Sequence, residues 1–228
     1  MPAPRSRVPK ARVPKARVKV RIHPLGDTAL VAELGARLDT ALNTRAIALA
    51  AALQKRRDVR RALAAHGTVT VHFDPEQVTH DALGAAVRRL AQRRPPVEEP
   101  GRLHRIPVVY DGPDLENVAG ALGLSPARVV ELHQRPIYRV FLVGFVPGWA
   151  YMGPLVDELV LPRRPVPRTE VPAGAVAIAE HETGIYPLPS PGGWHLIGRT
   201  SVRLFLPDSD PPSLFRIGDR VKFFAAGT

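Results

Sequence analysis

The chain has 228 residues, of which 45% are hydrophobic and 23% charged, a composition typical of a soluble globular protein with one large or two modest domains. It contains no cysteine, which excludes disulfides, thiol nucleophiles and thiolate metal sites and agrees with a reducing cytoplasm. No run approaches the ~18 apolar residues of a membrane span, and the basic, proline-containing start lacks the apolar segment of a signal peptide. We therefore expect a cytoplasmic protein that makes no use of a membrane.

The net charge of +11 is concentrated at the N-terminus. Residues 1–21 contain eight Lys and Arg residues and no acid, which leaves a net charge of only +3 for the rest of the chain. A nucleic-acid partner is therefore not expected for the body of the protein. Val-Pro-Lys-Ala-Arg occurs twice, at 8–12 and 13–17, with prolines that block a helix and little apolar surface. We predict a disordered basic tail over 1–21. The alternative is that this segment binds nucleic acid or an acidic partner.

Strands and helices alternate from residue 22 to about residue 94. Apolar spacing predicts two helices, over 40–57 with Asp39 as N-cap and over 78–92. Alternating or apolar runs predict strands over 28–34, 59–64, 68–73 and 104–110. The resulting β-α-β-β-α-β order is that of ferredoxin-like domains, although the last strand is equally able to open the next domain. We predict a ferredoxin-like α/β domain over 22–100 that ends in a proline-rich linker.

The second half of the chain has a different character. Asp114 and Ser125 are placed to cap two short helices, the second of which has Pro126 at its first position. Residues 137–143 predict a strand, and the nine prolines within 144–191 exclude a long helix there. The short apolar runs that follow, separated by Gly and Pro turns, are typical of a β-barrel or sandwich. The fold class is therefore α+β, with a mostly β domain over 101–228.

Familiar catalytic motifs are absent from the chain. It has no phosphate loop, no G-x-G-x-x-G, no G-x-S-x-G elbow and no H-E-x-x-H, and its eight histidines lack ligand spacing. We therefore expect no metal site and no nucleotide-binding loop on this chain.

The candidate chemistry lies between Phe141 and Thr200. Residues 144–151 form a Gly/Pro loop that carries several aromatic rings. These rings either line a pocket or pack over the barrel as part of its core. Residues 163–168 carry three arginines on a proline-stiffened segment, which either clamp a carboxylate or phosphate or lie in solvent. The glycines of 183–195 either admit a close ligand or form hairpin turns. His133 either joins this chemistry or interacts with the carbonyls at its helix end.

Three groups of motifs resemble one family when they are taken in order. They are Gly144-Phe-x-Pro-Gly-x-x-Tyr151, then Pro162-Arg-Arg-x-x-Pro-Arg-Thr-x-Val-Pro-Ala-Gly174, then Thr183-Gly-Ile-Tyr-Pro187 with Ser190-Pro-Gly-Gly-Trp-x-x-Ile-Gly-Arg-Thr200. This pattern resembles the 5-oxoprolinase B-subunit family, whose members are also labelled allophanate hydrolase subunit 1 or kinase inhibitor KipI-type. The resemblance runs from about Ile22 to the end of the chain.

The resemblance implies an N-terminal α/β domain and a C-terminal cyclophilin-like β-barrel. It also implies a hetero-oligomer with a C-type partner protein and a third, A-type protein, which opens 5-oxo-L-proline to L-glutamate with ATP. This chain is then expected to hold no cofactor and to be inactive alone, with a small lactam or amide as substrate. One departure is Ala179-Glu-His-Glu182, where family members commonly have Gly-Gly-x-Gln, and another is Trp149, where Phe is frequent.

Residue chemistry within these motifs, together with His133 and Glu182 outside them, gives the candidate site. As catalytic residues we predict His133, Arg168, Glu182 and Tyr186. As substrate-binding residues we predict Phe145, Pro147, Tyr151, Arg163, Arg164, Thr183, Gly192, Gly193, Trp194 and Arg199. The alternative functions are a regulator that binds and inhibits a sensor histidine kinase and, by fold analogy alone, a proline isomerase.

Overall fold

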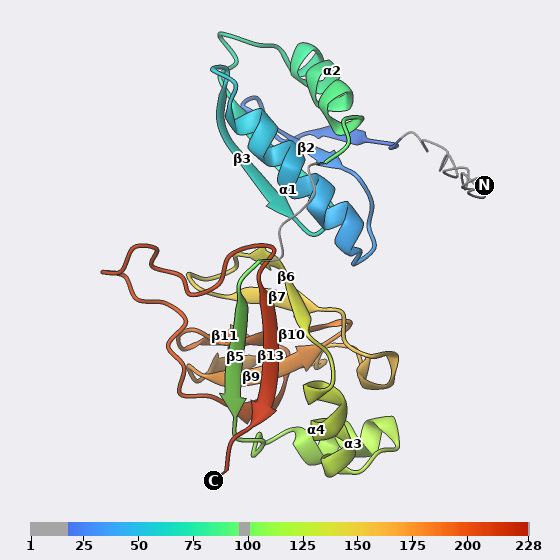
Figure 1. The fold of residues 1–228 in the computed structure, drawn as a ribbon, viewed down its shortest axis with the longest axis vertical. Coiled ribbons are helices and arrows are strands. Elements are labelled where there is room, and N and C mark those ends of the chain that lie inside the picture. The colour runs from blue at the N-terminus through green and yellow to red at the C-terminus, as the bar shows by residue number, and fades with distance from the viewer. Residues whose placement is uncertain (1–17, 96–100, 228) are drawn as a thin grey trace, which may run out of the picture.

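The computed structural model describes residues 18–95 and 101–227, which form an α/β domain and a β-barrel domain, one above the other in Figure 1. The predicted α+β class is confirmed. Within the described residues, no helix combines the length and the apolar character that crossing a membrane requires.

The N-terminal domain is a four-stranded antiparallel sheet with two helices packed against it. The strands have the order β1-β2-β4-β3. Their bounds and those of the helices are β1 (Arg21–Pro24), β2 (Ala29–Glu33), α1 (Thr40–Gln54), β3 (Val59–Ala65), β4 (Thr68–Phe73) and α2 (His80–Ala91). Val69, Val71 and Phe73 are fully buried on one face of β4, as their alternation predicts. Asp39 caps α1 by accepting the backbone N–H of Leu42.

The outer strand of this sheet differs from the expected one. Residues 104–110 were expected to complete a ferredoxin-like order, but β5 (Leu103–Val108) belongs to the barrel, so the alternative assignment is the correct one. The edge beside β2 is occupied by β1 instead. A short turn with Gly26 at φ +64° joins these two strands, and closing so short a loop costs less entropy than returning the chain from α2.

The predicted basic tail extends four residues too far. Arg21 begins β1, and Val18 and Val20 pack against the core of the N-terminal domain. The backbone of Val18 also exchanges two hydrogen bonds with the side-chain amide of Gln92. Residues 1–17, which carry the rest of that prediction, lie outside the described residues.

The C-terminal domain is built on a seven-stranded sheet with the order β12-β9-β10-β7-β6-β13-β5. Antiparallel backbone hydrogen bonds between Val109 and Arg199 join its two ends, so the sheet nearly closes into a barrel. Besides β5 its strands are β6 (Tyr138–Val143), β7 (Ala150–Gly153), β9 (Ala175–Ala179), β10 (Glu182–Ile185), β12 (His195–Arg199) and β13 (Arg220–Ala225). A separate two-stranded ribbon pairs β8 (Arg168–Val171) with β11 (Ser190–Gly192).

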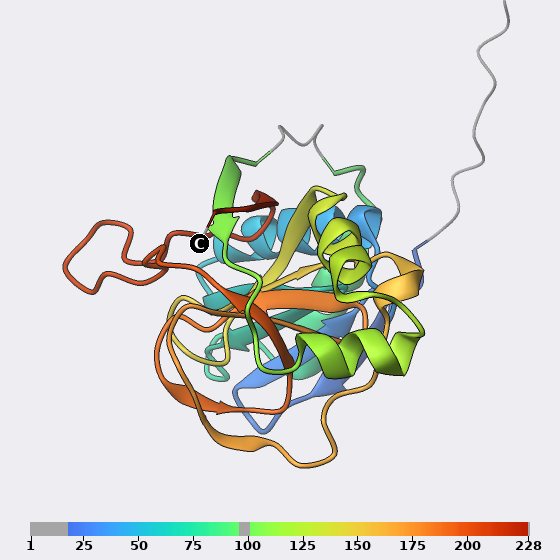
Figure 2. The same cartoon turned by 90° about the horizontal axis from the view of Figure 1, so that it is seen from below.

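Two helices cover the end of the barrel that is remote from the N-terminal domain, as Figures 1 and 2 show. They are α3 (Leu115–Leu122) and α4 (Pro126–Gln134), and a single 3₁₀ turn, η1 (Asp157–Leu159), follows β7. Ser125 caps α4 by accepting the backbone N–H of Arg128, with Pro126 at the first helical position. This cap is confirmed.

Strand alternation gives the barrel sheet two distinct apolar faces. In β9, Val176 and Ile178 point into the barrel interior, where they join the main core with residues of α3 and α4. Ala175, Ala177 and Ala179 point the other way, into a second cluster that β8 helps to cover. The sheet therefore separates an interior core from an outer apolar layer.

The two domains meet at a junction of buried hydrogen bonds. Asn43, which is fully buried, donates from its side-chain amide to the carbonyls of His66 (2.9 Å) and Phe141 (3.0 Å). Its own carbonyl accepts from Arg139 Nε at 2.9 Å, and the His66 backbone N–H donates to the Phe141 carbonyl at 3.1 Å. Both domains therefore share one satisfied polar network at this contact.

Candidate functional site

Four aromatic side chains form what we call the outer aromatic layer, on the outside of the barrel sheet. They are Trp149, Tyr151, Tyr186 and Trp194. The Trp149 ring is 4.6 Å from Tyr186 and 5.1 Å from Trp194, and the Tyr151 ring is 5.9 Å from Trp194 (ring centroids), all edge-to-face. The predicted residues Tyr151, Tyr186 and Trp194 are thus brought together in one layer.

Glycines in the adjacent strands make room for these rings. A Cβ at Gly184 on β10 would lie 2.7 Å from the Trp149 ring, and a Cβ at Gly192 on β11 would lie 2.0 Å from the Tyr186 hydroxyl. Any larger side chain would displace the aromatic group it faces. These two glycines of the Thr-Gly-Ile-Tyr and Ser-Pro-Gly-Gly-Trp motifs therefore shape the layer directly.

Beside this layer, two of the predicted arginines converge on one buried carboxylate. Asp114 Oδ1 accepts from Arg164 Nη1 at 2.9 Å and from Arg168 Nη2 at 2.7 Å, while Oδ2 accepts the backbone N–H of Leu196 at 2.7 Å. We call Asp114, Arg164 and Arg168 the arginine cluster. Two cations share one anion, so the cluster carries a net charge of +1.

The arginine cluster is joined to the outer aromatic layer through the β8–β11 ribbon. Arg168 lies opposite Gly192 in the ribbon, and Gly192 is the glycine that abuts Tyr186. The backbone N–H of Arg164 donates to the Gly193 carbonyl at 2.8 Å. Gly193 thus fixes the arginine segment through its backbone, and both predicted glycines lie at the boundary between cations and rings.

Asp114 does not perform the helix-capping role that the sequence indicates. It precedes α3, but its side chain makes no capping hydrogen bond and turns instead to the two arginines. Burial raises the pKa of this carboxyl, yet the hydrogen bonds from Arg168 and Leu196 and the two guanidinium charges outweigh burial and hold its pKa below the usual value. Asp114 is therefore a carboxylate at neutral pH. The capping signature of Asp114 hides this role in the sequence, although two arginines near a core require a counter-charge.

The remaining two arginines lie apart from the cluster. Arg163 Nε is 3.2 Å from Glu180, and Arg199 Nη2 is 2.8 Å from Asp111, with both members of each pair well exposed. Each of these cations already has one acidic partner, and exposed pairs of this kind contribute little stability.

The loop before β7 forms an exposed rim beside the layer. Phe145 is 61% exposed at φ +79°, an unfavourable backbone conformation for a bulky residue, and its ring centroid is 6.1 Å from that of Trp149. Pro147 is exposed on the same loop. Gly148 packs against Phe205 and Pro187, which fixes the far side of the loop. The predicted residues Phe145 and Pro147 thus border the outer aromatic layer without forming part of its core.

His133 and Thr183 lie on the opposite side of the sheet, in the barrel interior. Both are fully buried. The imidazole Nδ1 is 2.8 Å from the Tyr110 hydroxyl, and Nε2 is 2.9 Å from Thr183 Oγ1. Burial lowers the pKa of His133 to about 3, so the ring is neutral at physiological pH. The expected contact of this ring with helix-end carbonyls is replaced by these two side-chain partners.

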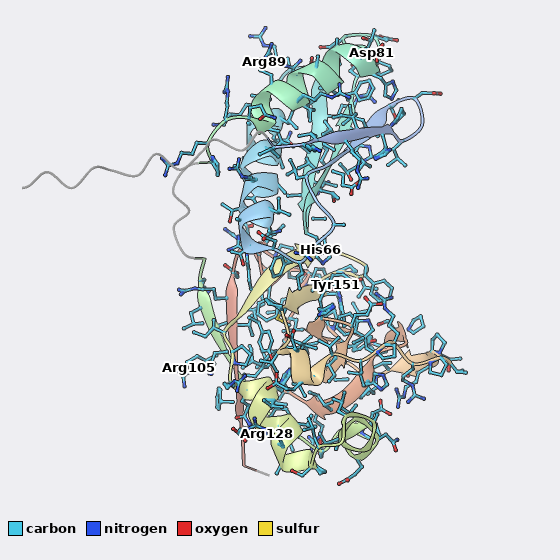
Figure 3. The ribbon with its side chains drawn as sticks, turned by 90° about the vertical axis from the view of Figure 1, so that its right-hand side faces the viewer. His66, Asp81, Arg89, Arg105, Arg128 and Tyr151 are labelled. Atoms are coloured by element: carbon cyan, nitrogen blue, oxygen red, sulfur yellow. The ribbon has the colours of Figure 1, made fainter. Side chains whose placement is uncertain are left out.

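Glu182 faces the domain junction. Its carboxylate accepts from His66 Nε2 at 2.8 Å, and the His66 ring is 5.9 Å from that of Tyr151. Figure 3 shows His66 and Tyr151 next to each other where the two domains meet. The glutamate that departs from the family pattern therefore pairs with the N-terminal domain, and its partner His66 contacts Tyr151 of the outer aromatic layer.

Tyr186 is the one predicted catalytic residue within the layer itself. It is 1% exposed, and burial raises the pKa of its phenol, while the backbone of Trp194 and the charge of Arg168 offset part of that rise. Its hydroxyl is therefore neutral at neutral pH and is suited to hydrogen bonding. Within the described residues, no group of three acidic or histidine side chains is arranged to hold a metal ion.

The chain matches the family described as carboxyltransferase domain, subdomain C and D, over residues 20–215. The K. lactis urea carboxylase structure shares this fold, with a TM-score of 0.78 at 18% identity over 96% of this chain and 23% of that one.

A curated relative from Escherichia coli O157:H7, named as the B subunit of 5-oxoprolinase, is 42% identical over 90% of this chain and 95% of its own length. The crystal structure of TTHA0988 is 40% identical, with a TM-score of 0.76, over 92% of this chain and 41% of that longer chain. The protein therefore belongs to the 5-oxoprolinase B-subunit family, as its motifs predict.

Proposed function

We propose that this chain is the B subunit of an ATP-dependent, cytoplasmic 5-oxoprolinase and acts together with C-type and A-type partner proteins. The outer aromatic layer and the arginine cluster are this chain's contribution to the shared site. The observation that carries this assignment is the convergence of Arg164 and Arg168 on buried Asp114, which places one excess positive charge beside a wall of rings. Family membership independently supports it.

A lactam needs activation before water opens it. In the proposed reaction, the γ-phosphoryl group of ATP passes to the lactam oxygen and ADP leaves. Water then adds to the activated carbon and the C–N bond breaks, which frees the amine and leaves an acyl phosphate. A second water releases phosphate and completes the new carboxylate of L-glutamate. Negative charge accumulates throughout, so fixed cations at the site lower the barrier.

The titratable groups of this chain support a shared site. His133 is fully buried behind the sheet, Tyr186 is almost fully buried and neutral, and Glu182 is already paired with His66. None of these three predicted proton-transfer groups is both free and accessible in the described chain, so we assign proton transfer to the partner. The arginine cluster, at +1, does not match the charge of a triphosphate, which supports a nucleotide site on the partner as well.

The test is reconstitution with the C-type and A-type proteins. We expect glutamate and ADP to form together only when this chain and its partners are mixed, and neither to form with this chain alone. Arg168→Ala should lower kcat/KM for 5-oxo-L-proline by roughly 10²-fold, because it removes a charge-assisted interaction of about 1.5–3 kcal/mol. Arg128→Ala is the matched control, because Arg128 is an exposed arginine paired with Glu131 on α4.

Turnover by the isolated chain would contradict the shared site. A reconstituted complex that releases no glutamate from 5-oxoproline would contradict the function. The kinase-regulator and proline-isomerase alternatives stay predictions, which an autophosphorylation assay and a peptide isomerisation assay respectively address.

A further inference from the structure

We propose that Arg164 and Arg168 form a subsite for the carboxylate of the lactam substrate, and that Asp114 is the positioning residue that holds both guanidinium groups in place. This inference rests on the proposed function and deepens it, because it states which part of the substrate the arginine cluster recognises.

Unused donors provide the first support. Asp114 Oδ1 already accepts hydrogen bonds from both arginines, and Oδ2 accepts one from the backbone N–H of Leu196. This carboxylate can therefore accept few further hydrogen bonds. Arg164 Nε and Arg168 Nη1 are nevertheless buried without an acceptor among the described residues. A buried N–H without an acceptor costs free energy, so it needs an explanation. An anion beside the cluster supplies the acceptors.

Charge balance identifies the kind of anion. The cluster holds two guanidinium groups and one carboxylate whose low pKa keeps it ionised. Asp114 has 3% side-chain exposure and the arginines 30% and 24%, so the site is only partly open to water. In such surroundings the stable complex is close to neutral. One monoanion achieves this, whereas a triphosphate leaves a large negative excess.

Geometry favours a carboxylate among monoanions. A guanidinium group presents parallel N–H donors that match the two oxygens of a carboxylate. Asp114 accepts one N–H from each guanidinium, which leaves the other N–H groups for a ligand. Fixing these groups before binding reduces the entropy that the complex loses.

The neighbouring surface suits the rest of a lactam. Arg168 lies opposite Gly192, which abuts Tyr186, and Tyr186 and Trp194 both contact Trp149. Trp149, Tyr186 and Trp194 are themselves buried, so the ring faces open to a flat, largely apolar five-membered ring are those of half-buried Tyr151 and exposed Phe145 at the rim of the layer. By contrast, Arg163 and Arg199 are each paired with one exposed acidic partner, so neither pair carries the excess positive charge of the arginine cluster.

The closing experiment compares two ligands that differ only in charge. Binding of 5-oxo-L-proline and of its neutral carboxamide to the reconstituted complex is measured by calorimetry, alongside glutamate release from 5-oxo-L-proline. The wild-type complex should bind the acid at least about tenfold more tightly, since charge-assisted hydrogen bonds contribute about 1.5–3 kcal/mol. Arg168→Lys and, separately, Arg164→Lys should lose most of this preference and leave the Kd of the carboxamide within about threefold.

Asp114→Asn tests the positioning role. It keeps both cations but removes the anion that orients them, so KM for 5-oxo-L-proline should rise while kcat changes much less. Arg128→Lys, in the exposed pair on α4, is the matched control and should change neither ligand's Kd.

Three outcomes overturn the subsite. The first is equal affinity of the wild-type complex for the acid and the carboxamide. The second is a folded Lys variant that binds both ligands more weakly by the same factor. If the wild-type complex releases glutamate in either case, the proposed function survives. If it neither binds nor turns over 5-oxo-L-proline, the proposed function fails and the subsite fails with it.

Discussion

Inside the barrel, the ring of His133 has a single hydrogen-bonding arrangement. The Thr183 hydroxyl donates to the Ala177 carbonyl at 3.0 Å, so its oxygen is left to accept from His133 Nε2–H. Nδ1 is then the unprotonated nitrogen and accepts from the Tyr110 hydroxyl. Both ring nitrogens are occupied, which makes His133 a structural element of the interior core.

This arrangement gives a prediction for pH titration. With a folded pKa of about 3, His133 should show no imidazole titration between pH 4 and pH 9 and should remain the Nε2–H tautomer, as measured by ¹⁵N NMR of the ring. The unfolded chain binds this proton near pH 6.5 and the folded chain does not. The free energy of unfolding should therefore fall as pH drops from about 6.5 toward 3, by up to about 1.4 kcal/mol per pH unit.

His133→Gln, which cannot titrate, should remove this contribution to the acid slope. A wild-type ring titrating with a midpoint near 6.5 would show that His133 is accessible and would reopen its predicted role in proton transfer.

Individual residues also show which features a sequence reveals. Asp39 and Ser125 were identified as caps because a cap bonds to the backbone three residues on, so the whole interaction lies within one short window. Asp114 has the same local signature but bonds to arginines 50 and 54 positions away. The spacing of nearby residues does not show whether this side chain caps its helix or bonds to distant arginines. The arginines themselves were identified, but the residue that orients them was not.

At the scale of elements, the sequence predicts where the strands lie but does not predict which strands pair with each other. Apolar alternation defines β4 within one window, whereas the partner of β5 is β13, which follows more than a hundred residues later. The same limit applies to the site. The motifs of β10, β11 and their loops were recognised, but only the pairing of strands shows that Thr183 faces inward while Gly184 and Tyr186 face outward.

The contact between β10 and the outer aromatic layer gives a second prediction. Gly184→Ala places a methyl group 2.7 Å from the Trp149 ring, where the side chain has rigid neighbours. We expect it to lower the free energy of unfolding by about 1–3 kcal/mol, the usual cost of overpacking. Urea denaturation, with tryptophan emission as a check on the ring environment, measures this.

Gly120→Ala is the matched control. Gly120 lies within helix α3, and a Cβ there meets nothing within 4 Å. Alanine should therefore raise the free energy of unfolding by about 0.5–1 kcal/mol. Equal effects of the two substitutions would contradict the tight contact between β10 and Trp149.

At the scale of the whole molecule, the junction couples two domains that each have their own core. Asn43 from α1 bonds to the carbonyls of His66 and Phe141, one in each domain. Asn43→Ala leaves both carbonyls without this donor and should destabilise the contact by about 1–3 kcal/mol. We expect the wild-type domains to unfold together and the variant domains to unfold at different urea concentrations.

Two probes separate the domains. Both tryptophans, Trp149 and Trp194, lie in the barrel, whereas α1 and α2 hold most of the helical residues. Tryptophan emission and far-ultraviolet circular dichroism should give coincident midpoints for the wild type and separated midpoints for Asn43→Ala. Gln54→Ala, an exposed amide bonded within the N-terminal domain, is the control. Coincident midpoints in the Asn43 variant would show that the junction does not depend on this residue.

The position of β13 has a consequence for synthesis. β13 lies between β5 and β6, and both of those strands precede it in the chain by many residues. The N-terminal sheet is complete once β4 has emerged from the ribosome, but the barrel retains two unpaired strand borders until its last strand arrives. Unpaired strand edges of this kind form hydrogen bonds with strands of other chains. Newly made protein is therefore most prone to aggregate during this interval, and slowing translation just before Arg220 should lower the soluble yield.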